Sequence, residues 1–290
     1  NPYHLSTWFG ALIARLRGKK VYYWMHGIYS DRLSAVDYIK ILFYKIAHGY
    51  FLYGNRAFRR LAELKVKPSH DMHVIYNSLD YDQSVNLRKS ISTLEIQTFR
   101  GNYFKNTNLP VAMFIGRVNI IKRIDLVIEA QRLLLDKGIP FNFLVVGDGE
   151  ERKNSEELAS KLGVSDYVSF YGASYDEAVN SYLIAASDLC VTPGEVGLTA
   201  IHAMSYGTPV VSHDNFNVQM PEVEAIKPGK TGDFFTQDNA KSLADIIEQW
   251  FKEHPYKTEE LKNDCYKIVD DFFNPNYQAD KLREVLAGNK

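Results

Sequence analysis

The chain has 290 residues, of which 46% are hydrophobic and 24% are charged, and its formal net charge is −1. This length is enough for two domains of ordinary size, and the composition is that of a soluble globular protein. No apolar run in the sequence reaches the roughly 18–20 residues of a membrane-spanning helix. The two cysteines, Cys190 and Cys265, have neither disulfide-framework nor metal-site spacing, which favours a reducing, cytoplasmic setting.

The charge is divided between the two parts of the chain. Residues 1–105 contain 16 Lys and Arg against 7 Asp and Glu, a balance of +9. Residues 106–290 contain 18 against 28, a balance of −10. This asymmetry indicates two domains, the first of which faces an anionic partner. The alternative is a basic face that is simply solvated.

The first hundred residues alternate between helical and strand-like patterns. Helical periodicity is present at 5–18, 35–49 and 56–66, and apolar, strand-like runs lie at 20–27, 50–54 and 72–78. Three strands make a thin sheet, so we interpret this region as the second half of a Rossmann-like domain whose first strands are absent. Residues 84–109 are polar and without clear periodicity, which predicts a hinge or an irregular excursion.

The pattern after residue 110 is more regular. Buried-strand runs at 111–116, 141–147, 167–172, 188–193 and 209–214 alternate with helical stretches. Several of these helices stop at a glycine, as a left-handed C-cap prefers, at Gly138, Gly163 and Gly207. This alternation predicts a doubly wound α/β domain with a parallel sheet. Three more helical patterns follow at 239–253, 256–272 and 276–287.

The turns that follow these strands are rich in glycine and basic residues. Gly116 and Arg117 follow the first strand, with Lys122 just beyond, and 147–151 and 193–198 are the turns "GDGEE" and "PGEVGL". In an open parallel sheet, ligands bind beyond the carboxyl ends of the strands. Glycine turns that open helices offer free amides and a positive dipole, and the two cations add charge. The sequence therefore predicts a diphosphate site.

Two common nucleotide motifs are absent from the sequence. There is no G-x-x-x-x-G-K-[ST] run, and "GDGEER" lacks the third glycine of the dinucleotide fingerprint. These absences count against nucleoside triphosphatase and nicotinamide-dependent activities.

Several of these segments resemble one family in the same order along the chain. The stretches "FIGRVNIIKRIDLVIEAQRLL", "FLVVGDGEE", "VSFYGAS", "ASDLCVTPGEVGLTAIHAMSYGTPVVSHD" and "PGKTGDFF" are similar to the donor-binding domain of the family 4 retaining glycosyltransferases, which have the GT-B fold. In the first half, "WMHG" and "VIYNSLDYD" resemble acceptor-domain segments of that family.

The resemblance implies two Rossmann-like domains with parallel sheets, the first one lacking its front part. Residues 1–108 would be the partial acceptor-side domain, 109–273 the donor-binding domain, and 274–290 a helix that packs back toward the first domain. The implied activity is metal-independent transfer of a hexose or other sugar, with retention, from a UDP- or GDP-linked donor to a glycan or lipid-linked acceptor. A role in surface polysaccharide synthesis would follow. No cofactor is implied beyond this co-substrate.

The resemblance also assigns roles to site residues. Members of that family usually have two glutamates eight residues apart, the first of which contacts the donor sugar and the second the ribose. Here Glu195 lies two residues before Gly197 rather than three, and His202 occupies the second position. We expect Glu195 at the sugar and His202 at the ribose, with a core histidine as the alternative for His202. The expected donor-binding set is Gly116, Gly147, Asp148, Gly149, Val196, Gly197, Leu198, Thr199 and His202.

His26 follows a strand in the first domain, in the stretch "YWMHGIY". The resemblance makes it a contact to the transferred sugar, with Asp31 and Arg32 as weaker helpers. The other interpretation is a turn histidine beside Gly27. Together with Arg117, Lys122 and Glu195, His26 completes the expected catalytic set.

Two further patterns have weaker functional interpretations. "DYD" at 80–82 is formally a metal-binding D-x-D, but it lies outside a nucleotide loop, and no zinc spacing occurs elsewhere, so we expect no metal. The basic, aromatic segment 38–67 suits anionic lipid headgroups at the inner membrane face or a polyprenyl-pyrophosphate acceptor. Aromatic core faces with a basic solvent side explain it equally well. No nucleic-acid motif accompanies the charge.

Two other functions remain open from the sequence. The altered glutamate pair and the thin first domain also suit a catalytically weak subunit that binds sugar nucleotides or glycans. A GT-B nucleotide-sugar epimerase would need carboxylates in the cleft, for which the sequence offers only Asp31 and Glu195.

Overall fold

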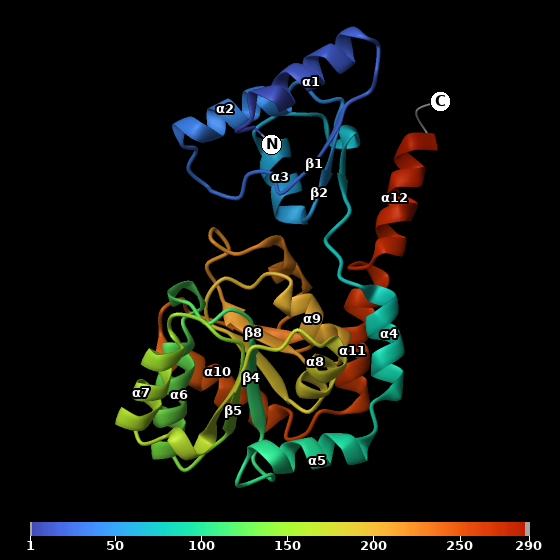
Figure 1. The fold of residues 1–290 in the computed structure, drawn as a ribbon. Coiled ribbons are helices and arrows are strands. Elements are labelled where there is room, and N and C mark those ends of the chain that lie inside the picture. Colours follow the sequence, from blue (N-terminus) through green and yellow to red (C-terminus); the bar gives the residue numbers. More distant parts are fainter. Residues whose placement is uncertain (1, 288–290) are drawn as a thin grey trace. The chain divides into compact units, whose positions relative to one another are not determined.

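The computed structural model describes residues 2–287, which form two compact units (Figure 1). The smaller unit contains the residues up to Asn77 together with those from Pro275 onward, and the larger unit is Ser78–Asn274. Residues 78–108, which we expected in the first domain, belong to the larger unit. The C-terminal helix belongs to the smaller unit.

The smaller unit is built on a parallel sheet of order β1-β2-β3. Its strands are β1 (Tyr22–Met25), β2 (Gly49–Leu52) and β3 (Met72–Val74). Its helices are α1 (Leu5–Leu16), α2 (Ala35–Tyr44), α3 (Asn55–Glu63) and α12 (Pro275–Ala287). The helix and strand patterns of the first hundred residues are therefore confirmed up to residue 78.

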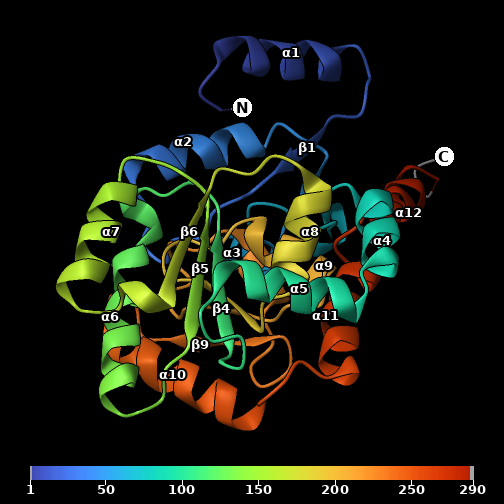
Figure 2. The same ribbon diagram turned by 60° about the horizontal axis from the view of Figure 1, so that its bottom comes forward.

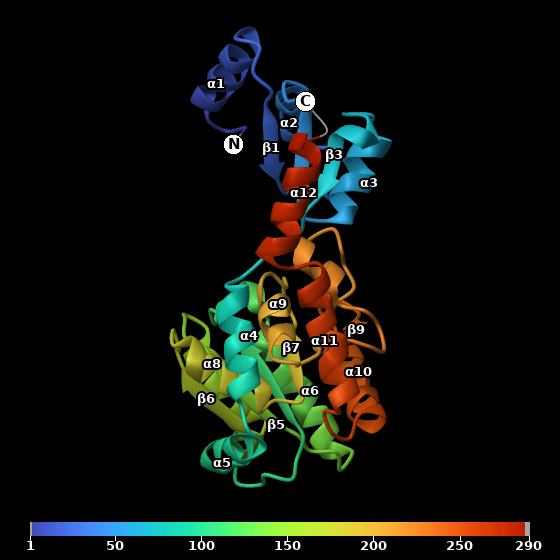
Figure 3. The same ribbon diagram turned by 90° about the vertical axis from the view of Figure 1, so that its right-hand side faces the viewer.

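Side chains of β2 alternate between two apolar clusters, as the pleat of a strand requires. Tyr50 and Leu52 pack with Phe43 of α2, whereas Phe51 packs on the other side with Val285 of α12. Helices therefore cover both faces of this small sheet, with α12 on the face opposite α2 (Figure 3).

The larger unit contains a parallel sheet of order β6-β5-β4-β7-β8-β9. Its strands are β4 (Val111–Ile115), β5 (Asn142–Val146), β6 (Val168–Gly172), β7 (Leu189–Thr192), β8 (Val210–His213) and β9 (Gly232–Phe235). The strands expected between residues 111 and 214 are all present, which confirms the doubly wound α/β class. We did not expect β9.

Helices cover both faces of this sheet (Figure 2). On one face lie α6 (Ile124–Asp136), α7 (Arg152–Lys161) and α10 (Ala240–Glu253). On the other face lie α4 (Tyr81–Ser90), α5 (Thr93–Tyr103), α8 (Glu177–Ala185), α9 (Thr199–Ser205) and α11 (Glu259–Asp271). Figure 3 shows α9 between α4 and α11. Short 3-10 turns lie at Ser69–Asp71, Ile120–Lys122, Ser165–Tyr167 and Pro221–Ala225.

The prediction of a hinge or irregular segment at 84–109 is wrong, because most of this segment is helical. The side chain of Asp80 accepts from the backbone N–H of Gln83 and caps α4. Ser92 and Glu95 form a capping box at the start of α5. Both helices have weakly apolar faces, so their capping residues, rather than their periodicity, mark where they begin.

The strand order reverses beside β4, which pairs with β5 on one side and β7 on the other. Connections leave toward opposite faces at such a point, and a crevice opens beyond the carboxyl ends of the strands. The turns that we expected to bind phosphate follow these strands.

Candidate functional site

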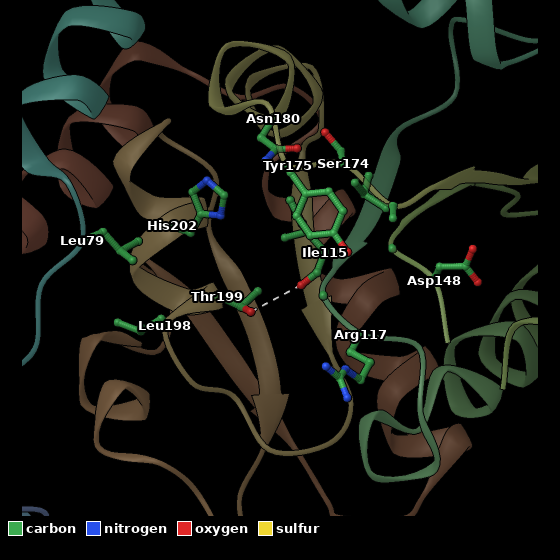
Figure 4. A pocket seen from close by; sticks show the side chains of 14 residues that line it. Leu79, Ile115, Arg117, Asp148, Ser174, Tyr175, Asn180, Leu198, Thr199 and His202 are labelled. Atoms are coloured by element: carbon green, nitrogen blue, oxygen red, sulfur yellow. Dashed lines mark hydrogen bonds between the residues drawn. The ribbon is translucent and has the colours of Figure 1, made fainter. Parts of the chain in front are cut away.

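A pocket of about 400 Å³ opens beyond the carboxyl ends of β4 and β5 in the larger unit (Figure 4). This volume is within the range of small-molecule sites. The lining residues come from the ends of β4, β5 and β6, from α8 and α9, and from the segment before α4. They are Leu79, Ile115, Gly116, Arg117, Val146, Gly147, Asp148, Ala173, Ser174, Tyr175, Asn180, Leu198, Thr199 and His202.

One wall of the pocket is formed by backbone. The N–H of Gly116 donates to the carbonyl oxygen of Val146 at 2.9 Å. Gly147 has φ +147°, and a Cβ there would lie 1.8 Å from the Gly116 carbonyl oxygen. Only glycine permits this approach, because both the φ angle and the space exclude a side chain. The structure thus brings two of the expected glycines together at the strand ends.

Arg117 lines the same wall, on the exposed surface of the pocket. Within residues 2–287 its guanidinium has no salt bridge or hydrogen-bond partner. The guanidinium is therefore available to bind a ligand. A planar guanidinium suits phosphate oxygens, which it can bind through two N–H groups at once.

Lys122 has a different position from Arg117. Its ammonium donates to the backbone oxygen of Glu195 at 2.6 Å and so ties the segment after β4 to the turn before α9. Burial lowers the pKa of Lys122, and the charge of Glu195 opposes that shift. A Cβ at Gly194 would lie 1.9 Å from the carbonyl oxygen of Ile121, so the two loops also approach through backbone. Lys122 is not among the residues that line the pocket, and it supports the turn from behind.

The turn before α9 offers fewer free amides than we expected. The N–H of Val196 donates to Oε1 of Gln219 at 2.8 Å, so that amide is occupied. The amides of Gly197 and Leu198 have no hydrogen-bond partner among the described residues. The hydroxyl of Thr199 donates to the carbonyl oxygen of Ile115 at 3.3 Å and joins α9 to the end of β4 (Figure 4).

Two other expected donor-site residues flank this region. Asp148 lines the pocket, and its carboxylate accepts from the N–H of Gly149 at 2.8 Å. Glu195 is half-buried in the turn, beside Lys122. Its carboxylate makes no hydrogen bond to the described residues, and it does not line the pocket.

His202 lies on the opposite wall of the pocket (Figure 4). Its Nε2 is 2.8 Å from Oε1 of Glu177, and the hydroxyl of Tyr206 donates to the same oxygen at 2.6 Å. Burial alone would raise the pKa of Glu177, but hydrogen bonds, those from His202 first, lower it below its ordinary value. Glu177 is therefore a carboxylate, and its contact with Nε2 fixes the position of the His202 ring.

Asn180 stands beside His202 on the pocket wall and is 6% exposed. Its side chain also helps to lower the pKa of Glu177, while its Oδ1 has no partner among the described residues. The sequence did not reveal this cluster. Glu177 and Asn180 are part of an ordinary helix start, "YDEAVN", and nothing in their spacing links them to His202.

His26 belongs to the smaller unit, directly after β1. It is exposed, and its ring packs against Tyr53 at a centroid distance of 4.7 Å. Arg60 donates to the backbone oxygens of Ser30 and Asp31 and fixes the loop that follows His26. The sugar contact of His26 stays a prediction.

The described part of the chain contains no group of three or more His, Cys, Asp or Glu residues placed to hold a metal ion. Asp80, in the "DYD" stretch, caps a helix instead. Among residues 2–287 we also find no helix with the length and apolar character to cross a bilayer.

Comparisons with known proteins agree with this architecture. Alpha-D-kanosaminyltransferase of Streptomyces kanamyceticus is 29% identical over 143 residues, which are 48% of this chain and 36% of that protein. Glycogen synthase 2 of Nitrosococcus oceani is 30% identical over 196 residues, 63% of this chain and 37% of that protein. The chain therefore spans little more than a third of the length of these relatives.

Solved structures show the same fold at lower identity. The crystal structure of Anabaena Alr3699/HepE in complex with UDP has a TM-score of 0.77 and 21% identity, covering 97% of this chain and 76% of that one. The same protein has been solved with UDP-glucose, at a TM-score of 0.71. The fold is that of the GT-B glycosyltransferases.

The sequence family described as "Glycosyl transferases group 1" matches residues 95–268, more than half of the chain. This match includes every residue that lines the pocket except Leu79. The chain belongs to the group 1 glycosyl transferases.

Proposed function

We propose that this protein transfers a sugar from a nucleoside diphosphate sugar to a glycan or lipid-linked acceptor, with retention of the anomeric configuration and without a metal ion. Uridine diphosphate is the first candidate for the nucleotide, because the neighbouring HepE structures contain UDP and UDP-glucose. Synthesis of a surface polysaccharide is the role we propose for the product.

The observation that carries this proposal is the backbone wall at Gly116 and Gly147 with Arg117 beside it. A diphosphate needs hydrogen-bond donors and positive charge in a concave site whose backbone can approach closely. The wall supplies the close approach, and Arg117 supplies a cation that has no partner among residues 2–287. The amides of Gly197 and Leu198 add donors on the facing turn.

The chemistry follows from where these charges lie. In transfer with retention, the bond between the anomeric carbon and the diphosphate breaks, and the acceptor oxygen bonds to the same face of that carbon. The leaving diphosphate gains negative charge, which Arg117 would stabilise most in the transition state. The acceptor's proton would pass to the departing diphosphate, and Lys122 would hold the turn that carries Glu195 near the sugar.

The test is nucleotide binding by thermal shift and calorimetry, with UDP, GDP and ADP, and with CMP as a monophosphate comparison. Arg117→Ala is the informative variant, because Arg117 has no partner within its own unit and its loss should leave the fold intact. We expect one diphosphate to bind, and we expect the variant to bind it roughly 10- to 100-fold more weakly, the effect of one or two charge-assisted hydrogen bonds.

The matched control is Lys153→Ala, which removes a cation whose side chain is 84% exposed in the same unit. It should bind the diphosphate like the wild type. Equal affinity of the wild type and Arg117→Ala would contradict the assignment of the phosphate wall. Sugar transfer in the presence of EDTA tests metal independence.

The acceptor side is a separate part of the proposal. The helix α1 exposes an apolar stripe at spacings of three and four residues, formed by Leu5, Phe9, Leu12 and Leu16. Three basic residues follow it directly, Arg17, Lys19 and Lys20. A lipid-linked acceptor lies at an anionic membrane surface, to which such a helix would bind.

The structure changes which part of the basic 38–67 segment supports this contact. Arg56, Arg60 and Lys67 donate to backbone oxygens of their own unit. The exposed apolar side chains of α2, such as Ile39 and Leu42, remain available beside α1. We expect co-sedimentation with vesicles that contain anionic lipid, reduced by Phe9→Glu. Equal binding to neutral vesicles would contradict an electrostatic contribution of the basic residues to membrane binding.

A further inference from the structure

The carboxylate of Glu177 has hydrogen bonds with two side chains, and a third side chain also stabilises its charge. The two donors are Nε2 of His202 at 2.8 Å and the hydroxyl of Tyr206 at 2.6 Å, and the third side chain is that of Asn180, which also lowers the pKa of the carboxyl group. Glu177 itself does not line the pocket, whereas His202 and Asn180 do. The carboxylate therefore lies behind the pocket wall and contacts the two residues that form it.

An ionised carboxylate can only accept hydrogen bonds, and this fixes the state of its neighbours. In the imidazole form of His202 the proton is on Nε2, because that atom faces Glu177. Nδ1 is then left as an acceptor, and Figure 4 shows a ring nitrogen of His202 turned toward the interior of the pocket. Glu177 thereby sets which kind of hydrogen bond His202 can make with a ligand.

The same reasoning applies to Asn180. Its amide NH₂ must be the end that faces the carboxylate, so Oδ1 is directed elsewhere. That oxygen is buried and has no partner among the described residues, and Asn180 as a whole is only 6% exposed. A buried acceptor left unpaired destabilises the folded protein, and a site that keeps one is expected to have a ligand for it.

We propose that Glu177 is a positioning residue that presents His202 Nδ1 and Asn180 Oδ1 as a pair of acceptors for the two hydroxyls of a ribose. This inference rests on the proposed function and concerns the nucleoside end of the same pocket. Two neighbouring hydroxyl donors are what a ribonucleotide offers and a 2′- or 3′-deoxynucleotide lacks. The resemblance implies a glutamate at the position of His202 on α9. Here the carboxylate is that of Glu177 on α8, and it would act on the ligand through His202 and Asn180.

The experiment measures the affinity of UDP, 2′-deoxy-UDP and 3′-deoxy-UDP for the wild type and for Glu177→Ala. We expect the wild type to bind UDP roughly five- to tenfold more tightly than each deoxy analogue, the effect of one hydrogen bond. In Glu177→Ala this preference should fall to about twofold or less, because the ring and the amide are free to turn. His202→Phe and Asn180→Ala should each lose the preference for one of the two hydroxyls.

Glu177→Gln keeps the volume of the side chain and an oxygen that can accept from His202. It should retain part of the preference for UDP, and it guards against a loss of fold in the alanine variant. The control is Glu259→Ala, because Glu259 likewise begins a helix but is exposed and forms a surface ion pair with Lys262. Glu259→Ala should prefer UDP over its deoxy analogues to the same extent as the wild type does.

The outcomes separate a positioning role from a merely structural one. If Glu177→Ala weakens UDP and both deoxy analogues by the same factor, the residue only supports the fold and the inference is wrong. The inference is equally wrong if Glu177→Ala keeps the full preference for UDP. If the wild type binds none of UDP, GDP and ADP, the proposed function fails, and the inference fails with it.

Discussion

The two ends of α8 differ in how their polar groups are satisfied. At the C-terminal end, Nζ of Lys257 donates to the backbone oxygens of Ala185 and Ser187, at 2.7 Å each. Nε of Arg100 donates to the oxygen of Ala186 at 2.8 Å. Each of these carbonyl groups therefore accepts a hydrogen bond from the N–H group of a basic side chain, as is common at the C-terminal end of a helix.

The N-terminal end of the same helix is less complete. Asp176 caps it by accepting from the N–H of Ala178 at 2.9 Å, and Glu177 has its donors. Yet one turn further on, Oδ1 of Asn180 has no partner among the described residues, and Asn180 lines the pocket.

This difference separates stability from recognition within one helix. An end whose polar groups are all satisfied contributes to folding and has nothing left to offer a ligand. An end that keeps a buried acceptor unpaired gives up some stability and gains a binding group. The predictions that follow test whether the two ends can be changed independently.

The largest effect is expected from Lys257→Met, at the C-terminal end. The substitution removes a donor from Ala185, Ser187 and the hydroxyl of Thr208 while keeping the apolar stem. Unpaired acceptors of this kind should lower the free energy of unfolding by about 3 kcal/mol. For a unit of this size that is a fall in melting temperature of roughly 10 °C.

The control for this change is Lys241→Met, at an exposed lysine paired with Asp245 in the same unit. It should shift the melting temperature by a degree or so at most. Below its melting temperature, Lys257→Met should bind UDP as the wild type does. A loss of affinity in the folded variant would show that the two ends are coupled.

The smallest effect is expected from Asp176→Ala, at the N-terminal end. Loss of the cap should cost about 1 kcal/mol of stability, because the N–H of Ala178 loses its acceptor. The backbone bond from the N–H of Asn180 to the oxygen of Asp176 does not depend on the side chain that is removed. The preference for UDP over its deoxy analogues should therefore stay as in the wild type. If that preference falls as far as in Glu177→Ala, capping rather than positioning controls the site.

The fold was largely predictable from the sequence because its strands are apolar runs bounded by glycine turns. The exceptions are instructive. The helix α5 has a weakly apolar face, and only the pair Ser92 and Glu95 marks where it begins. The short strand β9 contains Gly232 and Asp233, so neither length nor composition marks it as buried.

The candidate site was predictable where backbone forms it and unpredictable where side chains from different helices meet. The close approach of Gly116 and Gly147 is specified by glycines that follow strands, which the sequence shows directly. The contact between Glu177 and His202 joins residues 25 apart on two helices, and only the packing of those helices brings them together. A histidine in place of a glutamate suggested a change at the ribose, but not its partner.

The reversal of strand order beside β4 has a consequence for unfolding. The strands β4, β5 and β6 form one contiguous half of the sheet, and β7, β8 and β9 form the other. The seam between them is the pairing of β4 with β7, and the pocket draws on residues from both sides of it. A nucleotide bound there would contact residues from both halves of the sheet and hold the two halves together. It would slow the separation of the halves, so the lifetime of the folded protein, and not only its melting temperature, would depend on nucleotide concentration.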